Sequence, residues 1–386
     1  MDNKEQPRIF HLITRLVKGG AESKTLSTVL GINKYRFTVG YGAEYDQEQV
    51  DKLERNDVGT VQFPLIRHYN PITAVLAVFS LAWYLRKNDF DIVHTHSTEA
   101  GIIGRLAATL AGVPVIVHTV HGVPFAEDRN SMLERFVLAC ERLTAPLTDT
   151  IVVNADALAE DYLARGIGTE SQYKTVYSGI NLESFRDVEP APDVDGKGTR
   201  IVMVGRLVEG KGFDVLLDAV EQITDRNVSI YLVGEGPKRE WLEDEISARG
   251  LEETVSMLGY RSDIPAIMSA CDVFVLPSYR EGTPRVITEA MASGLPVIAT
   301  EIAGIPEQVV DGHSGYLIQP GDDEALARHL RELIDSPDRR QSIGATGRER
   351  VETFSEKTMV NDLTVLYADL LASKTTIQNE SGNDTR

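Results

Sequence analysis

Short apolar runs alternate with helical patterns along almost the whole chain, and this alternation constrains the fold more than any other feature. Strands separated by helix-length segments predict parallel sheets with crossover helices, and therefore an α/β fold. The expected strands of the first half are residues 8–14, 37–42, 91–97, 114–122 and 149–154. Those of the second half are residues 200–205, 229–234, 255–259, 272–277, 296–301 and 315–319.

The segment between the two halves, residues 186–200, is rich in Pro, Gly and Asp and has no periodicity. A chain of 386 residues is long enough for two domains of ordinary size. We predict two doubly wound, Rossmann-like domains that face each other across a cleft. The predicted boundaries are an N-terminal domain over residues 1–186, a linker over 187–199, a second domain over 200–354, a helix over 355–373 and a disordered tail over 374–386.

The formal charge of −19 argues against a nucleic-acid partner. It is unevenly divided, because residues 1–186 carry 19 basic and 22 acidic side chains and the remaining residues carry 20 and 36. An acidic, soluble surface explains this asymmetry. A near-neutral first half that approaches an anionic membrane explains it as well, and the sequence leaves both interpretations open.

Cys140 and Cys271 lie in apolar contexts in separate halves, which predicts buried free thiols and a reducing compartment. The N-terminal residues lack the layout of a signal peptide. The longest apolar run, residues 72–85, is shorter than the roughly 20 residues that span a bilayer, so we predict a buried helix there. We expect a cytoplasmic protein, with a peripheral position on the inner face of the cell membrane as a further option.

Two stretches carry groups that suit an anion. Gly19 and Gly20 precede an expected helix, where backbone N–H groups attract an anion, although a tight turn explains them too. Arg206 and Lys211 follow the first strand of the second domain in a glycine-bearing loop. Two cations at a strand end can hold a phosphate, the guanidinium as a planar fork and the ammonium as a point charge.

A further stretch, "LPSYREGTPRVITEAMASGLPVIAT", places Glu281 in the loop after a strand and Glu289 in the following helix. The carboxyl ends of strands in open α/β sheets are where ligands bind. The two carboxylates bracket a helix N-terminus, where the N–H groups of Arg285 and Val286 would meet a phosphate. Carboxylates beside it accept hydrogen bonds from hydroxyl-rich ligands such as ribose and hexose.

Histidines follow two neighbouring strands of the first domain, in "HTHS" (His94, His96) and "HTVHG" (His118, His121). The spacing of His94 and His96 puts both on one face of a strand and is compatible with zinc. Because no nearby Asp or Cys completes a set of ligands, we predict no metal site and no cofactor.

"VGRLVEGKG" together with "EGTPRVITEAMASGLPVIAT" resembles the second domain of the retaining glycosyltransferases of family 4, whose two-domain fold is GT-B. "GGAES" and "HTVHG" match first-domain loops of that family, and the resemblance spans roughly residues 8–372. It implies that residues 355–373 form a helix that returns to the first domain. It also implies a nucleotide-diphosphate sugar as donor and a glycan or lipid-linked acceptor, hence a role in polysaccharide biosynthesis.

The resemblance also assigns roles to residues. Arg206 and Lys211 would hold the diphosphate, Glu281 the sugar hydroxyls and Glu289 the ribose. His121 would sit beside the reacting sugar, and the loop around Gly20 would close over the diphosphate or the acceptor. The stretches that contain Glu235 and Tyr260 correspond to the wall that binds the base. Thr283 and Pro284 depart from the pair that many members carry there; this pair faces the sugar, so the donor sugar stays open.

The expected reaction is a metal-independent transfer of a hexose or N-acetylhexosamine with retention of configuration, with UDP-sugars favoured over GDP-mannose. A nucleotide-sugar epimerase or hydrolase of the same fold is the nearest alternative, followed by a non-catalytic nucleotide-sugar-binding subunit. A dinucleotide-binding oxidoreductase is disfavoured, because "VGEGPKREW" holds only a fragment of the required glycine pattern.

Overall fold

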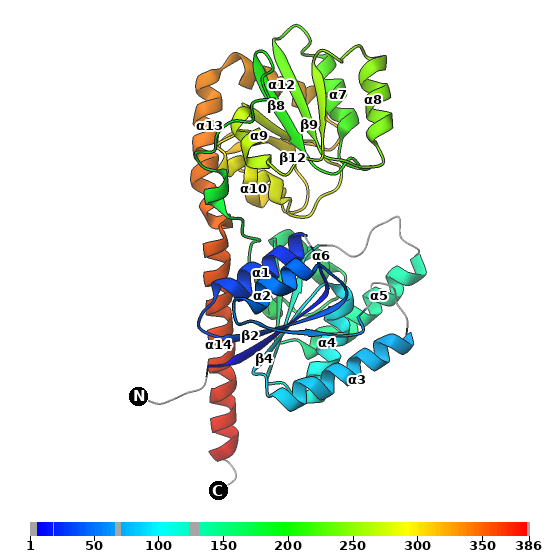
Figure 1. Ribbon diagram of the computed structural model, residues 1–386, viewed down its shortest axis with the longest axis vertical. Helices are drawn as coiled ribbons and strands as arrows, with labels where there is room; N and C mark the ends of the chain where they lie inside the picture. Colours follow the sequence, from blue (N-terminus) through cyan, green and yellow to red (C-terminus); the bar gives the residue numbers. More distant parts are fainter. Residues whose placement is uncertain (1–5, 18, 66–70, 123–130, 384–386) are drawn as a thin grey trace. The chain divides into compact units, whose positions relative to one another are not determined.

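A computed structural model describes residues 6–17, 19–65, 71–122 and 131–383 (Figure 1). The chain divides into two compact units. The first consists of Met1–Gly179 and Lys357–Arg386, and the second of Ile180–Glu356. The division therefore falls a few residues before the predicted boundary at 186/187.

The predicted linker belongs to the second unit. The backbone N–H of Ala191 donates to the carbonyl of Ala266 at 2.9 Å, and Ser269 Oγ donates to the carbonyl of Val188 at 2.6 Å. These bonds fasten the segment to a helix of that unit, α9 (Ile264–Ala270). A composition rich in Pro and Gly predicted a loop, but it could not show that the loop's backbone is bonded to the domain surface.

The first unit is an α/β domain with a seven-stranded parallel sheet among the described residues, in the order β3-β2-β1-β4-β5-β6-β7. Two of its strands, β3 and β7, were not predicted; they are short edge strands with few fully buried side chains. The elements are β1 (Arg8–Leu16), α1 (Gly20–Gly31), β2 (Arg36–Tyr45), α2 (Gln47–Glu54), β3 (Gly59–Gln62), α3 (Pro71–Asn88), β4 (Ile92–His96), α4 (Thr98–Ala111), β5 (Val115–Val120), α5 (Ser131–Thr144), β6 (Thr150–Val153), α6 (Asp156–Ala164), β7 (Tyr173–Thr175) and α14 (Glu356–Asn383).

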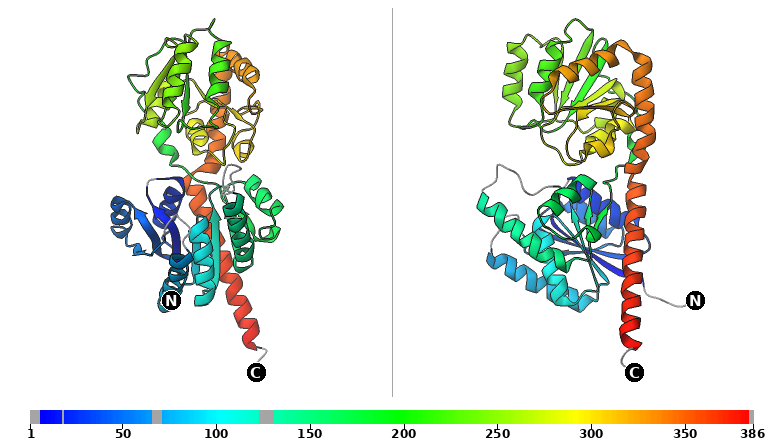
Figure 2. Two further views of the ribbon diagram at one scale, coloured as in Figure 1. Left: turned by 90° about the vertical axis from the view of Figure 1, so that its right-hand side faces the viewer. Right: turned by 180° about the vertical axis from the view of Figure 1, so that it is seen from behind.

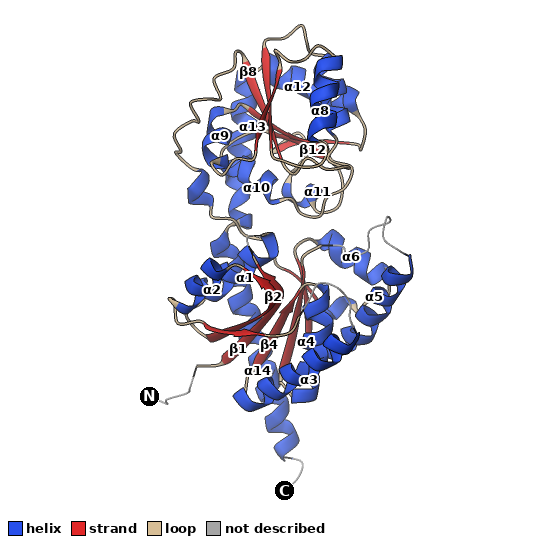
Figure 3. Cartoon of the chain, turned by 45° about the vertical axis from the view of Figure 1, so that its right-hand side comes forward, coloured by secondary structure: helices blue, strands red, loops and turns tan. Residues whose placement is uncertain are grey.

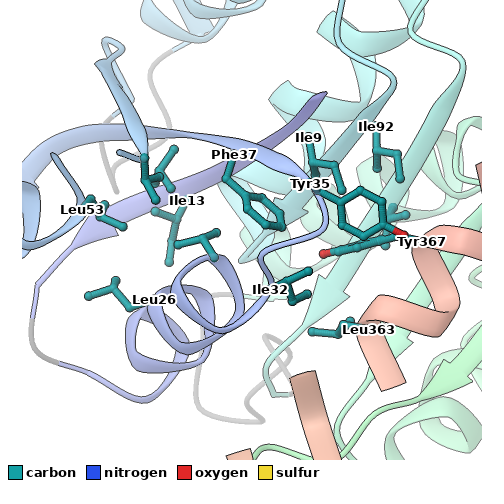
Figure 4. Close-up of a cluster of buried hydrophobic side chains, with 14 of the residues drawn as sticks. Ile9, Ile13, Leu26, Ile32, Tyr35, Phe37, Leu53, Ile92, Leu363 and Tyr367 are labelled. Carbon is teal, nitrogen blue, oxygen red and sulfur yellow. The ribbon is translucent and has the colours of Figure 1, made fainter. Parts of the chain in front are cut away.

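Helices cover both faces of the first sheet. Side chains of α1, α2 and α14 form one buried cluster with β1 and β2, and side chains of α3 and α4 form another on the opposite face (Figure 3). Leu363 and Tyr367 of α14 reach Ile9, Ile32 and Tyr35 in the first of these clusters (Figure 4). The C-terminal helix thus packs on the first unit, as the resemblance implied, and Figure 2 shows it running alongside that sheet.

The second unit holds a six-stranded parallel sheet in the order β10-β9-β8-β11-β12-β13. All six of its strands were predicted, because each is an apolar run with helical segments between. The elements are β8 (Thr199–Val204), α7 (Phe213–Glu221), β9 (Val228–Val233), α8 (Arg239–Ala248), β10 (Val255–Gly259), α9, β11 (Val273–Leu276), α10 (Arg285–Ala292), β12 (Val297–Thr300), α11 (Ile305–Gln308), β13 (Gly315–Ile318), α12 (Asp323–Asp335) and α13 (Pro337–Arg350).

The segment β11-α10-β12 follows local rules closely. The strands are buried on both faces, as expected for the middle of a parallel sheet. Pro284 is the N-cap of α10, and Gly294, with a φ of 80°, follows its last turn. These signals place the start of α10 directly after the loop that carries Glu281.

Two helices differ from their predictions. The predicted buried helix is α3, whose outer face is exposed at Val75, Leu76, Phe79 and Trp83, because only one side of it meets the sheet. The predicted disordered tail is wrong over most of its length, since α14 continues to Asn383 and no proline interrupts it. No helix of the described residues is both long and apolar enough to cross a membrane.

Candidate functional site

The strand order of the second sheet reverses between β8 and β11, which are neighbours in the sheet. Ligands of open α/β sheets bind at such a switch point, beyond the carboxyl ends of the strands. Arg206 and Lys211 lie in the loop after β8, and Glu281 lies in the loop after β11. The fold therefore brings three of the predicted site residues to one edge.

Lys211 and Glu281 form an ion pair. Lys211 Nζ donates to Glu281 Oε1 at 2.7 Å, and Ser278 Oγ donates to the same oxygen at 2.8 Å. A Cβ at Gly212, where φ is 74°, would lie 1.9 Å from the carbonyl oxygen of Pro277. The glycine thus lets the loop after β8 approach the end of β11, and this approach brings Lys211 to Glu281.

Arg206, unlike Lys211, has no partner in the described part of the chain. Its side chain is exposed, and among the described residues it has neither a hydrogen bond nor an ion-pair partner. Lys211 uses one of its three N–H donors on Glu281 and keeps two. Within the described part of the chain, the site thus presents one guanidinium without a protein partner and one ammonium that a carboxylate holds in place.

The helix α10 contributes Arg285, Val286 and Glu289. Burial raises the pKa of Glu289, and the charge of Arg285 acts in the opposite direction. Among the described residues the carboxylate of Glu289 has no hydrogen-bond partner, and the buried Nε of Arg285 has none either. Buried polar groups are normally bonded, so the buried Nε of Arg285 is a donor that a ligand could engage.

Thr283 and Pro284 lie in the loop that enters α10. The carbonyl of Pro284 accepts a hydrogen bond from Gln308 Nε2 at 3.1 Å, and Gln308 is buried. Ser278 and Gln308, neither of which was predicted as a site residue, support this loop. Ser278 lies only three residues before Glu281, so its contact with Glu281 could have been expected from the sequence. Gln308 is distant in the sequence, and nothing local connects it to the loop.

Glu235 and Tyr260 follow β9 and β10, which are adjacent strands. Glu235 Oε1 accepts from Arg239 at 2.5 Å, and Tyr260 is 77% exposed. Both residues lie at the carboxyl edge of the sheet that also carries Arg206, on strands on the far side of β8 from Glu281.

In the first unit, Gly19 and Gly20 stand at the start of α1 and are exposed. A Cβ at Gly19 would lie 2.4 Å from Glu22 Oε2, whereas a Cβ at Gly20 would have no neighbour within 4 Å. The close approach of the buried Glu22 side chain accounts for Gly19. Only Gly20 keeps open space beside the first free N–H groups of the helix.

Four histidines are buried within the strands β1, β4 and β5, and a fifth, His121, is half-buried just after β5. Burial lowers the pKa of His11 to about 3 and the pKa values of His94, His96 and His118 well below their ordinary value. The pKa of His121 is lowered as well, first by burial and then by the charge of Lys24. These imidazoles are neutral at pH 7.

His11 was not predicted to join the other histidines, because it lies inside a strand and not at its end. The parallel register of β1 and β4 pairs it with His94. His11, His94 and His96 each offer a nitrogen, and these atoms lie within 4.8 Å of one another, which is near the arrangement of a three-imidazole metal site. Each ring nitrogen of the three already has a hydrogen-bond partner, so a cation would have to break those bonds.

Two family models match the chain. The model described as "Glycosyl transferase 4-like domain" matches residues 6–177, and the model described as "Glycosyl transferases group 1" matches residues 185–350. The two matches meet close to the division between the units.

Individual relatives agree with these models. The chain is 31% identical over 322 residues to the UDP-Gal:α-D-GlcNAc-diphosphoundecaprenol α-1,3-galactosyltransferase of Escherichia coli, covering 80% of this chain and 83% of the relative. It is 27% identical over 328 residues to the capsular polysaccharide biosynthesis glycosyltransferase CapM of Staphylococcus aureus, covering 79% of this chain and 86% of the relative.

Solved structures share the fold. HepE of Anabaena in complex with UDP superimposes with a TM-score of 0.80 at 23% identity, covering 94% of this chain and all of that one. A glycosyltransferase from Rickettsia africae superimposes with a TM-score of 0.81 at 21% identity, covering 95% of this chain and 99% of that one.

Proposed function

The chain belongs to the group 1 glycosyltransferases of GT-B fold, and from this premise we propose that it transfers a hexose or N-acetylhexosamine from a UDP-sugar to a hydroxyl of a lipid-linked glycan. The transfer retains the anomeric configuration and uses no metal ion. The observation that carries the proposal is the set of polar groups beyond the switch point of the second sheet that have no protein partner among the described residues: the Arg206 guanidinium, the Glu289 carboxylate and the buried Nε of Arg285.

The donor site is assigned by charge. A nucleotide diphosphate is an anion, and the exposed guanidinium of Arg206, the two remaining N–H donors of Lys211 and the N-terminus of α10 suit it. Glu289 suits the ribose hydroxyls, because its carboxylate is half-buried and has no partner among the described residues. Glu281 suits hydroxyls of the sugar, and Lys211 holds it in place.

The same groups suit the transition state. As the anomeric bond breaks, positive charge develops on the sugar and negative charge on the departing diphosphate. Donors that are already in place stabilise that negative charge without a metal ion. Glu281 is engaged by Lys211 and Ser278 and is therefore a poor nucleophile for a double displacement. Attack from the face that the diphosphate leaves, with the diphosphate taking the acceptor's proton, gives retention.

UDP is the favoured nucleotide because of the relatives. The Escherichia coli relative is named for UDP-Gal and a diphosphoundecaprenol acceptor, and the Anabaena structure is a complex with UDP. These names also favour galactose as the first sugar to test and a lipid diphosphate as the acceptor. Glu235 and Tyr260, at the ends of β9 and β10, are the groups we assign to the base.

A lipid-linked acceptor would require the enzyme to work at a membrane, and the first unit has a suitable surface. We define the apolar face as the exposed apolar side chains of α3, α4 and α5, three helices of the first unit of which α4 packs against the other two (Figure 3). Its members are Val75, Leu76, Phe79, Trp83, Leu106, Leu110, Met132, Leu133, Phe136 and Leu143.

The charges around the apolar face suit an anionic bilayer. Arg86 and Lys87 are exposed in the last turn of α3, a helix that contains no Asp or Glu, and Arg135 and Arg142 are exposed on α5. Apolar residues with flanking cations favour the interface of an anionic membrane. We therefore propose a peripheral position at the cytoplasmic membrane.

The transferase activity is tested by incubating the full chain with UDP-galactose and a GlcNAc-diphospholipid, with and without EDTA. We expect a disaccharide-lipid with an α linkage by NMR, at the same rate in EDTA. Free galactose or an epimerised UDP-sugar as the main product would instead support the hydrolase or epimerase alternative. Binding of UDP-sugar without any product would support a non-catalytic subunit.

Membrane contact is tested by sedimentation with vesicles of phosphatidylglycerol or phosphatidylcholine. We expect the chain to sediment with the anionic vesicles and the double variant Phe79→Ser, Trp83→Ser to remain in solution. Val310→Ser removes an exposed apolar side chain of the second unit and is the matched control. Equal sedimentation of the double variant and the control would exclude the apolar face as the contact.

A further inference from the structure

We propose that Tyr367 of α14 fixes the tautomer of His121 through a chain of hydrogen bonds that crosses the first unit by way of His11 and His96. In this arrangement Nε2 of His121 carries the proton and Nδ1 is left as an acceptor. Tyr367, His11 and His96 are thus positioning residues for His121, although they lie on other helices and strands. The inference rests on the proposed function only for the statement that His121 contacts the sugar.

The chain of bonds is continuous. Tyr367 Oη lies 3.2 Å from His11 Nε2, and His11 Nδ1 lies 2.9 Å from His96 Nε2. His96 Nδ1 then lies 3.2 Å from His121 Nε2. Beyond Tyr367 the chain continues, since Tyr367 Oη lies 2.6 Å from His94 Nδ1 and His94 Nε2 lies 2.6 Å from Thr119 Oγ1.

The protons along this chain are coupled. A neutral imidazole has one N–H donor and one acceptor nitrogen, so a ring that accepts on one side must donate on the other. Burial keeps His11 and His96 neutral. The buried hydroxyl of Tyr367 must itself donate to one of its two histidine neighbours. Only two arrangements then satisfy every bond: all donors point away from His121, or all point toward it.

The distances select one arrangement. Hydrogen bonds with an O–H donor are typically shorter than those with an N–H donor. Tyr367 Oη is much closer to His94 Nδ1 than to His11 Nε2, so the phenol donates to His94 and accepts from His11. His11 then accepts from His96, and His96 accepts from the Nε2–H group of His121. Among the described residues, Nδ1 of His121 is left without a partner.

The consequence is chemical. A His121 ring in this tautomer accepts a hydrogen bond from a sugar hydroxyl at Nδ1, and it cannot donate one there. The opposite tautomer would present an N–H group at the same place. Because α14 supplies Tyr367, the C-terminal helix takes part in setting the hydrogen-bonding character of a residue at the far end of the chain of bonds.

The first test is the wild-type tautomer, which needs no substrate. In the full chain with ¹⁵N-labelled histidine, long-range ¹⁵N–¹H spectra distinguish protonated from unprotonated ring nitrogens, and the signals missing from His121→Gln assign the ring. We expect Nε2–H for His121. An Nδ1–H tautomer would overturn the proposal. So would binding of one equivalent of Zn²⁺ to His11, His94 and His96, seen as a shift of their unprotonated ring nitrogens, because the metal would take the place of the hydrogen bonds.

The second test reverses the chain. In Tyr367→Phe, Nε2–H of His11 loses its acceptor, so His11 should move its proton to Nδ1 and donate to His96, which then donates to His121. We expect the His121 tautomer to switch to Nδ1–H and turnover to fall about 10-fold while UDP affinity is unchanged. Tyr35→Phe is the matched control, because Tyr35 packs against Tyr367 in the same core but donates to the carbonyl of Thr364.

The outcomes separate this inference from the proposed function. If the tautomer switches in Tyr367→Phe but no sugar transfer is found with any donor, the chain of bonds stands and the proposed function fails. If transfer is found but the tautomer is the same in wild type and Tyr367→Phe, the function stands and this inference fails. A switch in Tyr35→Phe as well would show a general packing effect and would also overturn it.

Discussion

The two sheets of this protein are both parallel and covered by helices, but their polar side chains lie in different places. In the first unit, polar groups lie inside the sheet: His11, His94, His96 and His118 are buried, neutral and hydrogen-bonded. In the second unit, the strands β11 and β12 have apolar buried cores, and the charged groups stand in the loops beyond them. Groups kept neutral can orient a hydroxyl-bearing partner, whereas groups kept charged suit a diphosphate.

This difference predicts that acid lowers the free energy of unfolding more in the first unit than in the second. It is the largest effect on stability that we expect. Folding lowers the pKa of these histidines, so the unfolded chain binds their protons more readily than the folded chain. The free energy of unfolding is therefore unaffected above the unfolded pKa of about 6.5 and decreases as the pH falls below that value. For His11, with a folded pKa of about 3, the loss between pH 6.5 and 4.5 is about 2–3 kcal/mol, and the other buried histidines act in the same direction.

The two tryptophans report the two units separately, since Trp83 lies in the first and Trp241 in the second. We expect the fluorescence of Trp83, followed in Trp241→Phe, to show unfolding at a higher pH than the fluorescence of Trp241 followed in Trp83→Phe. Coincident acid transitions would remove the distinction between the units.

Lys24 should make the stability of the first unit depend on pH above pH 7 as well. It is buried in α1, donates to the carbonyl of Val176 at 3.0 Å, and burial lowers its pKa to about 7. Because the unfolded chain binds this proton up to about pH 10.4, the stability of the first unit should rise as the pH increases from 7 toward 10. Lys24→Met should abolish this slope and add about 2–3 kcal/mol at pH 7.5. Urea unfolding followed by Trp83 measures both, and an unchanged slope would show that Lys24 is not neutral when folded.

Glu289 gives the smallest effect, in the second unit. Its half-buried carboxylate has no partner among the described residues, so Glu289→Gln should raise the free energy of unfolding by about 1 kcal/mol and weaken UDP binding about 10-fold. Urea unfolding followed by Trp241 and calorimetric titration with UDP measure the two quantities. A variant that is less stable than the wild type would mean that the carboxylate has a structural partner.

The sequence was sufficient for the second sheet and for most of the candidate site, because each strand is a continuous apolar run and the site residues follow strands directly. It was not sufficient for contacts that depend on register or on distant elements. His11 joins the histidines only through its pairing with His94, and Tyr367 joins them only because α14 returns to the first unit. The ion pair of Lys211 with Glu281 could not be predicted either, since it depends on how closely two loops approach.

The central claim is that the second unit binds the diphosphate of a UDP-sugar through Arg206, and stability in the presence of nucleotide tests it most directly. UDP at about 100 times its dissociation constant should add roughly 2.7 kcal/mol to the unit that Trp241 reports, in the Trp83→Phe background. GDP and ADP should add little. The stabilisation should disappear in Arg206→Ala and remain in Arg328→Ala, which removes an exposed arginine of α12. Turnover of Arg206→Ala should fall roughly 10²–10³-fold, as for the loss of one preorganised donor. Undiminished stabilisation by UDP in Arg206→Ala, or a stabilisation seen only by Trp83, would contradict the account.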